Sequence, residues 1–259
     1  MLIEQRMTGS PRRISSLNYV DLIFCITSNP ARSWKAGVAT GVPSAKHIEY
    51  LMFGLVLLYA LVTAGAAAAL YVVLLLALLV SPTFQAHVVY LHAIPATSRG
   101  NLDAPEQFGF LHNQVTPFFI RSLRSESLYA WHIIPIALYY KHELDLRNER
   151  SGLVVDVTTR VTFKLLRDDP SSLLVIHFHG AGGNVGSGYR CSNYRVLSAG
   201  LPDNIHVLTF DYRGFGRSTG FPSEQGIILD ALAVVSWAMT VAQVPAKRIL
   251  IYGQSLGTA

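Results

Sequence analysis

The sequence has 259 residues, of which 51% are apolar and only 14% are charged, whereas soluble domains average about 25% charged residues. This composition excludes an intrinsically disordered chain, and two cysteines are too few for a disulfide scaffold. The charge deficit is localised, because residues 50–98 contain no Asp, Glu, Lys or Arg. The composition therefore predicts a membrane segment joined to a globular domain.

The net charge of +5 does not indicate a nucleic-acid partner. Residues 1–49 carry six basic and three acidic residues, and residues 99–259 carry 15 basic and 13 acidic residues. A phosphate-binding surface needs clustered Lys and Arg, whereas the charges of the larger part are scattered and nearly balanced. We expect no nucleic-acid partner.

Residues 50–80 form one apolar run without a charged residue. At about 1.5 Å per residue, roughly 20 helical residues cross a hydrocarbon core of ~30 Å, so the run suffices for one tilted helix but not for two. Its length and the long arm before it, residues 1–49, argue against a cleavable signal peptide. The sequence predicts a single-pass membrane anchor at residues 50–80.

The basic residues that flank the run predict its orientation. Arg32, Lys35 and Lys46 lie shortly before it, whereas the first basic residue after it is Arg99. Under the positive-inside rule the amino terminus is cytosolic, and residues 81–259 lie on the lumenal or extracellular side.

The two cysteines agree with this topology. Cys25 and Cys191 lie on either side of the predicted anchor and would be separated by the membrane. They could not form a disulfide with each other there. We therefore interpret both as ordinary free thiols.

Residues 81–150 are predicted to be a linker and juxtamembrane segment. Five prolines disfavour long helices in it: Pro82, Pro95, Pro105, Pro117 and Pro135. The stretch 129–140 is aromatic and uncharged, which fits either a surface that dips into the membrane interface or an apolar segment packed on the globular domain. We prefer the second interpretation.

From residue 151 to residue 259 the pattern is that of an α/β domain. Short, wholly apolar runs predict three buried strands, at 173–178, 206–210 and 248–252. Partial alternation predicts an edge strand at 154–166, and helices are expected at 190–199 and 223–243. Apolar strands separated by helices indicate a mostly parallel sheet that is covered on both faces.

The motif Gly253-Gln254-Ser255-Leu256-Gly257 directly follows the third apolar run. A G-x-S-x-G sequence after a strand is typical of a serine nucleophile on a tight, strained strand-to-helix turn. A Cβ at either flanking glycine would crowd this turn. The turn would lift the Ser255 hydroxyl clear of the sheet and point the Leu256 amide at the oxygen that becomes negative during acyl transfer.

A second glycine-rich motif, HGAGGN at 179–184, follows the apolar run 173–178. In a hydrolase sheet this turn supplies the other oxyanion donor, which would be the Ala181 amide. A phosphate-binding loop is the rival interpretation. The sequence has no G-x-x-x-x-G-K-[ST], however, and the stretch 186–188 lacks the third glycine of the dinucleotide fingerprint. We therefore predict an oxyanion loop.

The histidines before the second motif offer a metal-binding alternative. His177 and His179 are two apart on a strand and project to one face, where Asp211 would complete a site. A histidine just before such a turn usually hydrogen-bonds and shapes the loop, so we expect no metal. In DYRGFGRS, Asp211, Arg213 and Arg217 are expected to brace the loop after the next strand.

These motifs resemble the α/β-hydrolase superfamily. The resemblance rests on HGAGGN, TFDYRGFGRSTGFPSEQG and YGQSLGTA, between His179 and Ala259. Within the superfamily, the sequence is most similar to the membrane-anchored monoacylglycerol and lysophospholipid lipases of the α/β-hydrolase-domain-containing protein 12 type. The PSE-x-G helix start at 222–226, the Trp131-His132-x-x-Pro135 element and the single anchor narrow the match to that branch.

The resemblance implies an α/β-hydrolase fold with a serine nucleophile at Ser255, oxyanion amides at Ala181 and Leu256, and no cofactor. It also implies a lumenal or extracellular catalytic domain, with the endoplasmic reticulum as the expected membrane. The implied substrates are single-chain lipid esters, such as monoacylglycerols or lysophosphatidylserine, which are cleaved through an acyl-serine intermediate.

One departure from the family pattern concerns the catalytic triad. In this fold the triad follows the chain order Ser, Asp or Glu, His. The sequence stops at Ala259, four residues after Ser255, so neither the acid nor the histidine follows the serine in this chain. We interpret residues 151–259 as the amino-terminal part of a hydrolase domain. The chain alone is expected to be inactive, and the predicted activity is that of the full-length parent.

Three functions remain open at this point. The first is a lipid ester hydrolase. The second is a thioesterase, such as a protein depalmitoylase, or an acyltransferase, because the serine turn does not distinguish these reactions. The third is a non-catalytic protein whose hydrolase fold lacks a complete triad.

Overall fold

A computed structural model describes residues 44–93, 100–122 and 126–258 of the chain. Most of the predicted amino-terminal arm, including Cys25, lies outside the described residues. The chain divides into two units, residues 1–66 and 67–259, and helix α2 (Ala45–Val80) crosses the division.

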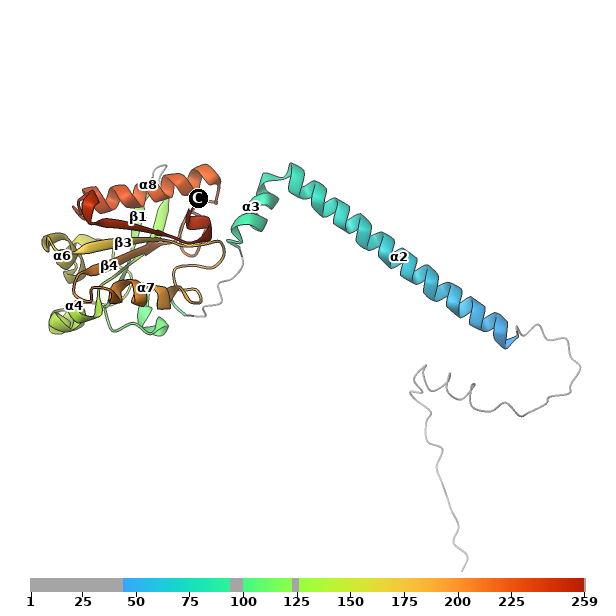
Figure 1. Cartoon of the computed structure of the whole chain (residues 1–259), viewed down its shortest axis with the longest axis horizontal. Helices are drawn as coiled ribbons and strands as arrows, with labels where there is room; N and C mark the ends of the chain where they lie inside the picture. The colour runs from blue at the N-terminus through green and yellow to red at the C-terminus, as the bar shows by residue number, and fades with distance from the viewer. Residues whose placement is uncertain (1–43, 94–99, 123–125, 259) are drawn as a thin grey trace, which may run out of the picture. The chain divides into compact units, whose positions relative to one another are not determined.

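Helix α2 contains the whole apolar run predicted from the sequence (Figure 1). It begins at Ala45, five residues before the charge-free run, because the Ser44 carbonyl accepts hydrogen bonds from the amides of His47 and Ile48. None of its side chains is buried. Its 36 residues span about 54 Å, more than the ~30 Å hydrocarbon core of a bilayer. By length and composition, α2 is able to cross a membrane.

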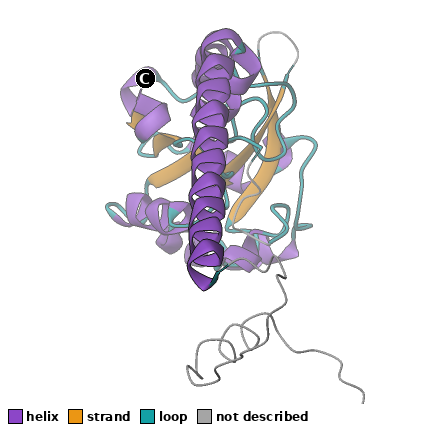
Figure 2. Ribbon diagram, turned by 90° about the vertical axis from the view of Figure 1, so that its right-hand side faces the viewer, coloured by secondary structure: helices purple, strands orange, loops and turns teal. Residues whose placement is uncertain are grey.

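The second unit is built on a five-stranded sheet with the order β1-β2-β4-β3-β5. Figure 2 draws strands of this sheet in orange. Strand β3 pairs in parallel with β4 and β5, whereas β2 pairs antiparallel with β1 and β4. The parallel arrangement is thus confirmed for the three predicted strands, and two antiparallel strands precede them. Burial is confirmed for β3 and β4 but is wrong for β5, where Leu250, Ile251 and Tyr252 are exposed at the edge of the sheet. The strands are β1 (Val115–Arg121), β2 (Ser127–Ile133), β3 (Leu173–Phe178), β4 (Ile205–Phe210) and β5 (Ile249–Gly253).

Helices cover both faces of the sheet, with α8 and α7 on opposite sides in Figure 1. Helices α6 and α8 pack on one face, and α7 packs on the other together with the segment 102–110. The helices predicted at 190–199 and from residue 223 are confirmed as α7 and α8. The helices are α3 (Pro82–Tyr90), α4 (Ile136–Lys141), α5 (Glu143–Asn148), α6 (Val161–Asp168), α7 (Arg190–Ala199) and α8 (Glu224–Thr240). Short 3-10 turns are η1 (Pro105–Phe108), η2 (Val157–Thr159), η3 (Ala246–Arg248) and η4 (Ser255–Thr258).

Strand β2 corrects the linker predicted for residues 81–150. Its side chains alternate between the two faces: Leu128 and Ala130 join the core under α6 and α8, whereas Tyr129 and Trp131 join the core under α7. Both aromatic side chains are fully buried, and Trp131 Nε1 donates to the Leu102 carbonyl at 3.1 Å. The preferred interpretation of this aromatic stretch, packing on the globular domain, is confirmed.

The edge strand predicted at 154–166 is wrong. Only Val154 forms a β-bridge, with Phe118, and residues 161–168 form α6 instead. Phe163 and Leu166 are three residues apart, which places both on one face of a helix, and both are buried in the core. The tertiary packing of these two side chains outweighs the strand-like alternation that precedes them.

Candidate functional site

The turn after β5 has the strained backbone predicted for a serine nucleophile. Ser255 has φ +49°, in the left-handed region that residues other than glycine rarely adopt. A Cβ on Gly253 would overlap the Gly257 carbonyl oxygen, and one on Gly257 would overlap the Phe178 carbonyl oxygen. The two glycines therefore let β5 turn tightly against the end of β3.

The Ser255 side chain is exposed at the end of the sheet. Among the described residues, its Oγ has no hydrogen-bond partner. The residue before it is held firmly, because the Gln254 amide donates to the Phe178 carbonyl at 3.0 Å and its Nε2 to the Tyr189 hydroxyl at 2.7 Å. The backbone of the turn is therefore held in place, whereas the Ser255 hydroxyl is not.

The HGAGGN loop lies against this turn. A Cβ on Gly180 would be 3.2 Å from Ser255 Cβ and 3.7 Å from its Oγ, so only a glycine lets the loop approach this closely without a shift. The amides of Ala181 and Leu256 form no hydrogen bond with another described residue. The two amides predicted as oxyanion donors thus sit on the two segments that meet at Ser255, and both are unpaired.

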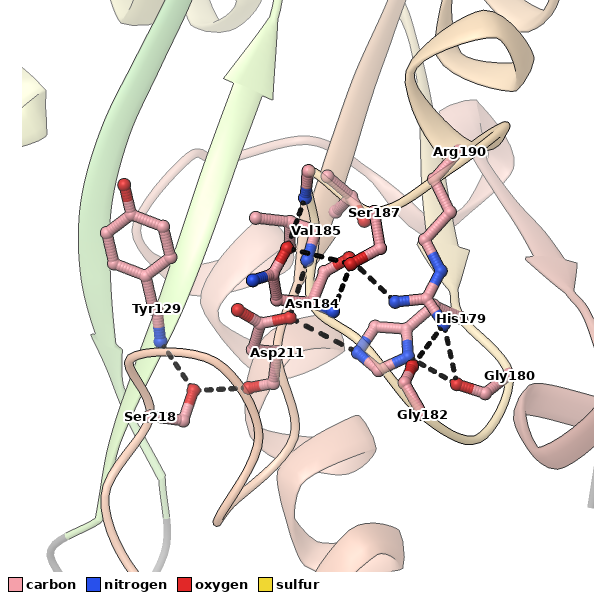
Figure 3. Close-up of polar contacts among 12 residues, drawn as sticks. Tyr129, His179, Gly180, Gly182, Asn184, Val185, Ser187, Arg190, Asp211 and Ser218 are labelled. Carbon is pink, nitrogen blue, oxygen red and sulfur yellow. Dashed lines mark hydrogen bonds and ion pairs between the residues drawn. The ribbon is translucent and has the colours of Figure 1, made fainter. Parts of the chain in front are cut away.

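A buried network supports the loop from β4 (Figure 3). His179 and Asp211 are fully buried, with His179 Nε2 3.4 Å from Asp211 Oδ1. The same carboxylate oxygen accepts the Val185 amide at 2.7 Å, and His179 Nδ1 donates to the Gly180 carbonyl at 2.7 Å. His179 and Asp211 therefore fix the path of the loop and serve as structural residues, as the sequence predicts.

The two arginines of DYRGFGRS also brace this end of the domain. Arg213 forms a buried pair with Asp230, with a shortest distance of 2.7 Å, and Asp230 also accepts the Ser122 hydroxyl at 2.7 Å. Arg217 pairs with Asp103, and its guanidinium lies over the Tyr129 ring, 5.3 Å from the centroid. These contacts confirm the structural roles predicted for both arginines.

Comparison with known proteins supports the fold described above. Residues 174–259, from β3 to the serine turn, match the family described as the alpha/beta hydrolase fold. Lysophosphatidylserine lipase ABHD12 of Xenopus tropicalis is 29% identical over 189 residues, 73% of this chain and 44% of the relative. The protein of the same name from Gallus gallus is 30% identical over 177 residues, 68% of this chain and 41% of the relative. The chain is an ABHD12-like α/β-hydrolase-fold protein.

The chain spans less than half the length of these curated relatives. A crystal structure of an alpha-beta hydrolase from Vibrio vulnificus is 17% identical and covers 69% of this chain and 50% of that one, with a TM-score of 0.44. The fold assignment rests on the matched family and on the observed sheet.

Two contacts that hold the HGAGGN loop in this ABHD12-like chain are not predicted by the sequence. Arg190, the first residue of α7, is 5% exposed and points into the loop (Figure 3). The Tyr90 carbonyl at the end of α3 accepts the Gly182 amide at 2.8 Å. Most arginines lie on the surface, and a backbone carbonyl leaves no mark on the residue type, so neither contact is predictable from composition or spacing.

His177 lies where the strands that carry the two motifs meet. Its ring is fully buried, and Nδ1 lies 3.3 Å from the Thr209 hydroxyl oxygen. The ring stacks on that of Tyr252 in β5, with 5.4 Å between the two ring centroids. Burial, with smaller contributions from His179 and Arg190, lowers the pKa of His177 to about 4. His177 is therefore neutral near pH 7 and packs as part of the core.

The described residues contain no group of three His, Cys, Asp or Glu side chains placed to hold a metal ion. His177 and His179, the candidates from the sequence, contact different rings: His177 contacts Tyr194 and Tyr252, whereas His179 contacts Tyr212. Cys191 is a buried free thiol, and burial raises its pKa to about 11, so it is not a nucleophile near pH 7.

Proposed function

We propose that the chain is the nucleophile-bearing part of a membrane-anchored serine hydrolase that cleaves carboxylic esters of single-chain lipids. The observation that carries this proposal is the strained turn at Ser255 facing the HGAGGN loop, with two unpaired amides on the two segments. The relatives named lysophosphatidylserine lipase support a lysophospholipid as substrate, and monoacylglycerols carry the same single-chain ester.

In the proposed reaction, Ser255 Oγ attacks the ester carbonyl and forms an acyl-serine, and water then hydrolyses it. The amides of Ala181 and Leu256 donate to the oxygen that becomes negative, where one such donor accounts for about 10²–10³ in kcat. Because Ser255 Oγ has no partner among the described residues, the proposal requires a histidine and an acid from another part of the protein.

The proposed location follows from α2. We place residues 1–44 in the cytosol and residues 81–259 on the lumenal side, because basic residues precede α2 and Arg99 is the first one after it. Protease treatment of sealed endoplasmic-reticulum vesicles should leave the second unit intact until detergent is added. Digestion of that unit in sealed vesicles would overturn this orientation.

A lipid hydrolysis assay tests the activity. The protein is expressed from its full reading frame and assayed in membranes. The panel holds a monoacylglycerol, lysophosphatidylserine and an acyl thioester, each with water alone and with an added alcohol. We expect ester hydrolysis that falls by about 10³-fold or more in Ser255→Ala, because the nucleophile is lost. The matched control is Ser192→Ala, an exposed serine on α7, which should retain full activity.

The same panel separates the other reactions. Preference for the thioester indicates a depalmitoylase-type enzyme, and acyl transfer to the alcohol indicates an acyltransferase. Ester hydrolysis that survives in Ser255→Ala contradicts the proposal.

A further inference from the structure

Arg190 is surrounded by backbone carbonyl groups of the HGAGGN loop (Figure 3). Its Nη1 donates to the Asn184 carbonyl at 2.7 Å, and its Nη2 to the carbonyls of Gly180 at 3.0 Å and Gly182 at 2.7 Å. Nη2 also lies 3.5 Å from the Ala181 carbonyl oxygen. Within the part of the chain that the structure describes, Arg190 forms no ion pair with a carboxylate. One buried guanidinium therefore contacts the carbonyl oxygens of four residues in this loop.

The orientation of these carbonyls fixes the orientation of the amides. In a planar trans peptide, the C=O of one residue and the N–H of the next point in opposite directions. None of the described peptide bonds is cis. Since the Gly180 carbonyl points at Arg190, the Ala181 N–H points away from it. His179 Nδ1 donates to the same Gly180 oxygen at 2.7 Å, so two donors hold this peptide plane.

The next peptide of the loop provides a check on this geometry. The Ala181 carbonyl lies on the guanidinium side, and the following amide, that of Gly182, points the other way and donates to the Tyr90 carbonyl at 2.8 Å. The amide side of the loop therefore faces away from Arg190. The Ala181 N–H is unpaired among the described residues, and a Cβ on the preceding residue, Gly180, would lie 3.7 Å from Ser255 Oγ.

We propose that Arg190 is a positioning residue for the reaction at Ser255: by holding the Gly180 carbonyl, it aims the Ala181 N–H at the developing oxyanion. This inference rests on the proposed function, because an oxyanion forms only if Ser255 attacks an acyl group. Arg190 touches neither substrate nor Ser255 in this account, and it acts only through the peptide plane.

An arginine suits this task better than a lysine. The guanidinium is a rigid planar fork with five N–H donors, so two nitrogens can serve carbonyls on different residues at once. A lysine keeps the positive charge but has one nitrogen, which cannot serve the carbonyls of Asn184 and Gly180 with the same geometry. Charge alone and donor geometry can therefore be separated by experiment.

The test compares Arg190→Lys, Arg190→Gln and the control Arg195→Gln in the protein expressed from its full reading frame. Arg195 lies on the same helix and donates to the carbonyl of Phe108, a residue outside the HGAGGN loop. The measurements are kcat and KM for the best lipid ester, the rate of fluorophosphonate labelling, and the melting temperature. We expect kcat and the labelling rate to fall by about 10²-fold in Arg190→Gln and by at least about tenfold in Arg190→Lys, because a misdirected oxyanion donor acts in the transition state.

KM should change by less than about threefold in both Arg190 variants, since the loop stabilises the transition state more than the bound substrate. Arg195→Gln should retain kcat. If Arg190→Gln does not fold, Arg190→Lys decides the question. A folded Arg190→Lys or Arg190→Gln with wild-type kcat and labelling rate overturns the positioning role. A wild-type protein that is not labelled and hydrolyses no ester overturns the proposed function itself, so the two failures are distinguishable.

Discussion

The two segments that meet at Ser255 are built in different ways. Three groups hold the HGAGGN loop: the buried side chains of Arg190 on α7 and Asp211 after β4, and the Tyr90 carbonyl at the end of α3. The serine turn is held by steric fit between glycines and the end of β3, and its side chain is exposed.

This difference matches two different requirements of the proposed reaction: a preorganised amide donor on the loop and a reactive hydroxyl on the turn. A loop that must present an amide in one direction needs many fixed contacts, because a donor that reorients during the reaction contributes less to the rate. A nucleophile also needs a fixed backbone, but its hydroxyl must be unpaired so that a base can reach it. Changes in the loop should therefore alter catalysis through geometry, and changes in the turn should alter folding first.

The largest effect is expected for Gly257→Ala. Its Cβ would overlap the Phe178 backbone, so β5 cannot turn against β3, and the unfolding free energy should fall by about 4 kcal/mol or more. Urea unfolding in detergent micelles measures this change. The control is Gly200→Ala, where the new Cβ has its nearest neighbour at 3.6 Å and the expected change is within about 1 kcal/mol. Equal stability of the two variants would contradict steric control of the turn.

Asp211→Asn should have the next largest effect, on the loop side. It removes the charge of a buried carboxylate that accepts the Val185 amide and lies 3.4 Å from His179 Nε2. Weakening such a charge-assisted hydrogen bond costs about 1.5–3 kcal/mol of unfolding free energy. Asp203→Asn, at an exposed pair with Lys141, should cost less than about 1 kcal/mol. A cost for Asp211→Asn no greater than that of the control would show that the network does not support the loop.

Acid should destabilise the folded protein through His177, which lies where the strands that carry the two segments meet. Its pKa is about 4 when folded, below about 6.5 for an unfolded histidine. The unfolded chain therefore binds the proton more readily, and stability falls as the pH drops. Between pH 7 and pH 5 this histidine alone should remove about 2 kcal/mol.

The pH dependence is measured from urea unfolding of the wild type and His177→Gln at both pH values. The variant should lose about 2 kcal/mol less than the wild type over this interval. Identical pH dependence of the wild type and His177→Gln would contradict burial of the neutral ring.

The smallest change in stability is expected for Gly180→Ala, where the segments touch. The new Cβ meets Ser255 Cβ at 3.2 Å, so a shift of a few tenths of an ångström relieves the contact, and the cost should stay below about 1 kcal/mol. Labelling of Ser255 should still slow by about tenfold, because the shift moves the Ala181 amide away from the oxyanion. Unchanged labelling would mean that the loop does not act on Ser255.

The parallel half of the sheet is predictable from the sequence. Strands β3, β4 and β5 are short apolar runs, and the glycine-rich turns after β3 and β5 mark their ends. Strands β3 and β4 are buried on both faces, whereas β5 is exposed at the edge of the sheet. The serine turn and its facing loop follow from these turns, because the carboxyl ends of parallel strands lie at the same edge of a sheet.

The antiparallel half of the sheet and the contact of Arg190 with the loop are not predictable from the sequence. Pro117 argues against a strand, yet β1 is the edge strand of the sheet, where a missing N–H is tolerated. The aromatic residues of β2 fit a membrane interface as well as a core. The role of Arg190 depends on the direction in which the loop carbonyls point, and only the three-dimensional path of the backbone determines that direction.

The most direct test of the account is the position of a covalent label. The protein expressed from its full reading frame is treated with a fluorophosphonate probe, digested, and sequenced by tandem mass spectrometry. The account predicts one modified peptide, with the phosphonate on Ser255, and its loss in Ser255→Ala. A phosphonate on another residue, or none on Ser255, would contradict the assignment of Ser255 as the nucleophile.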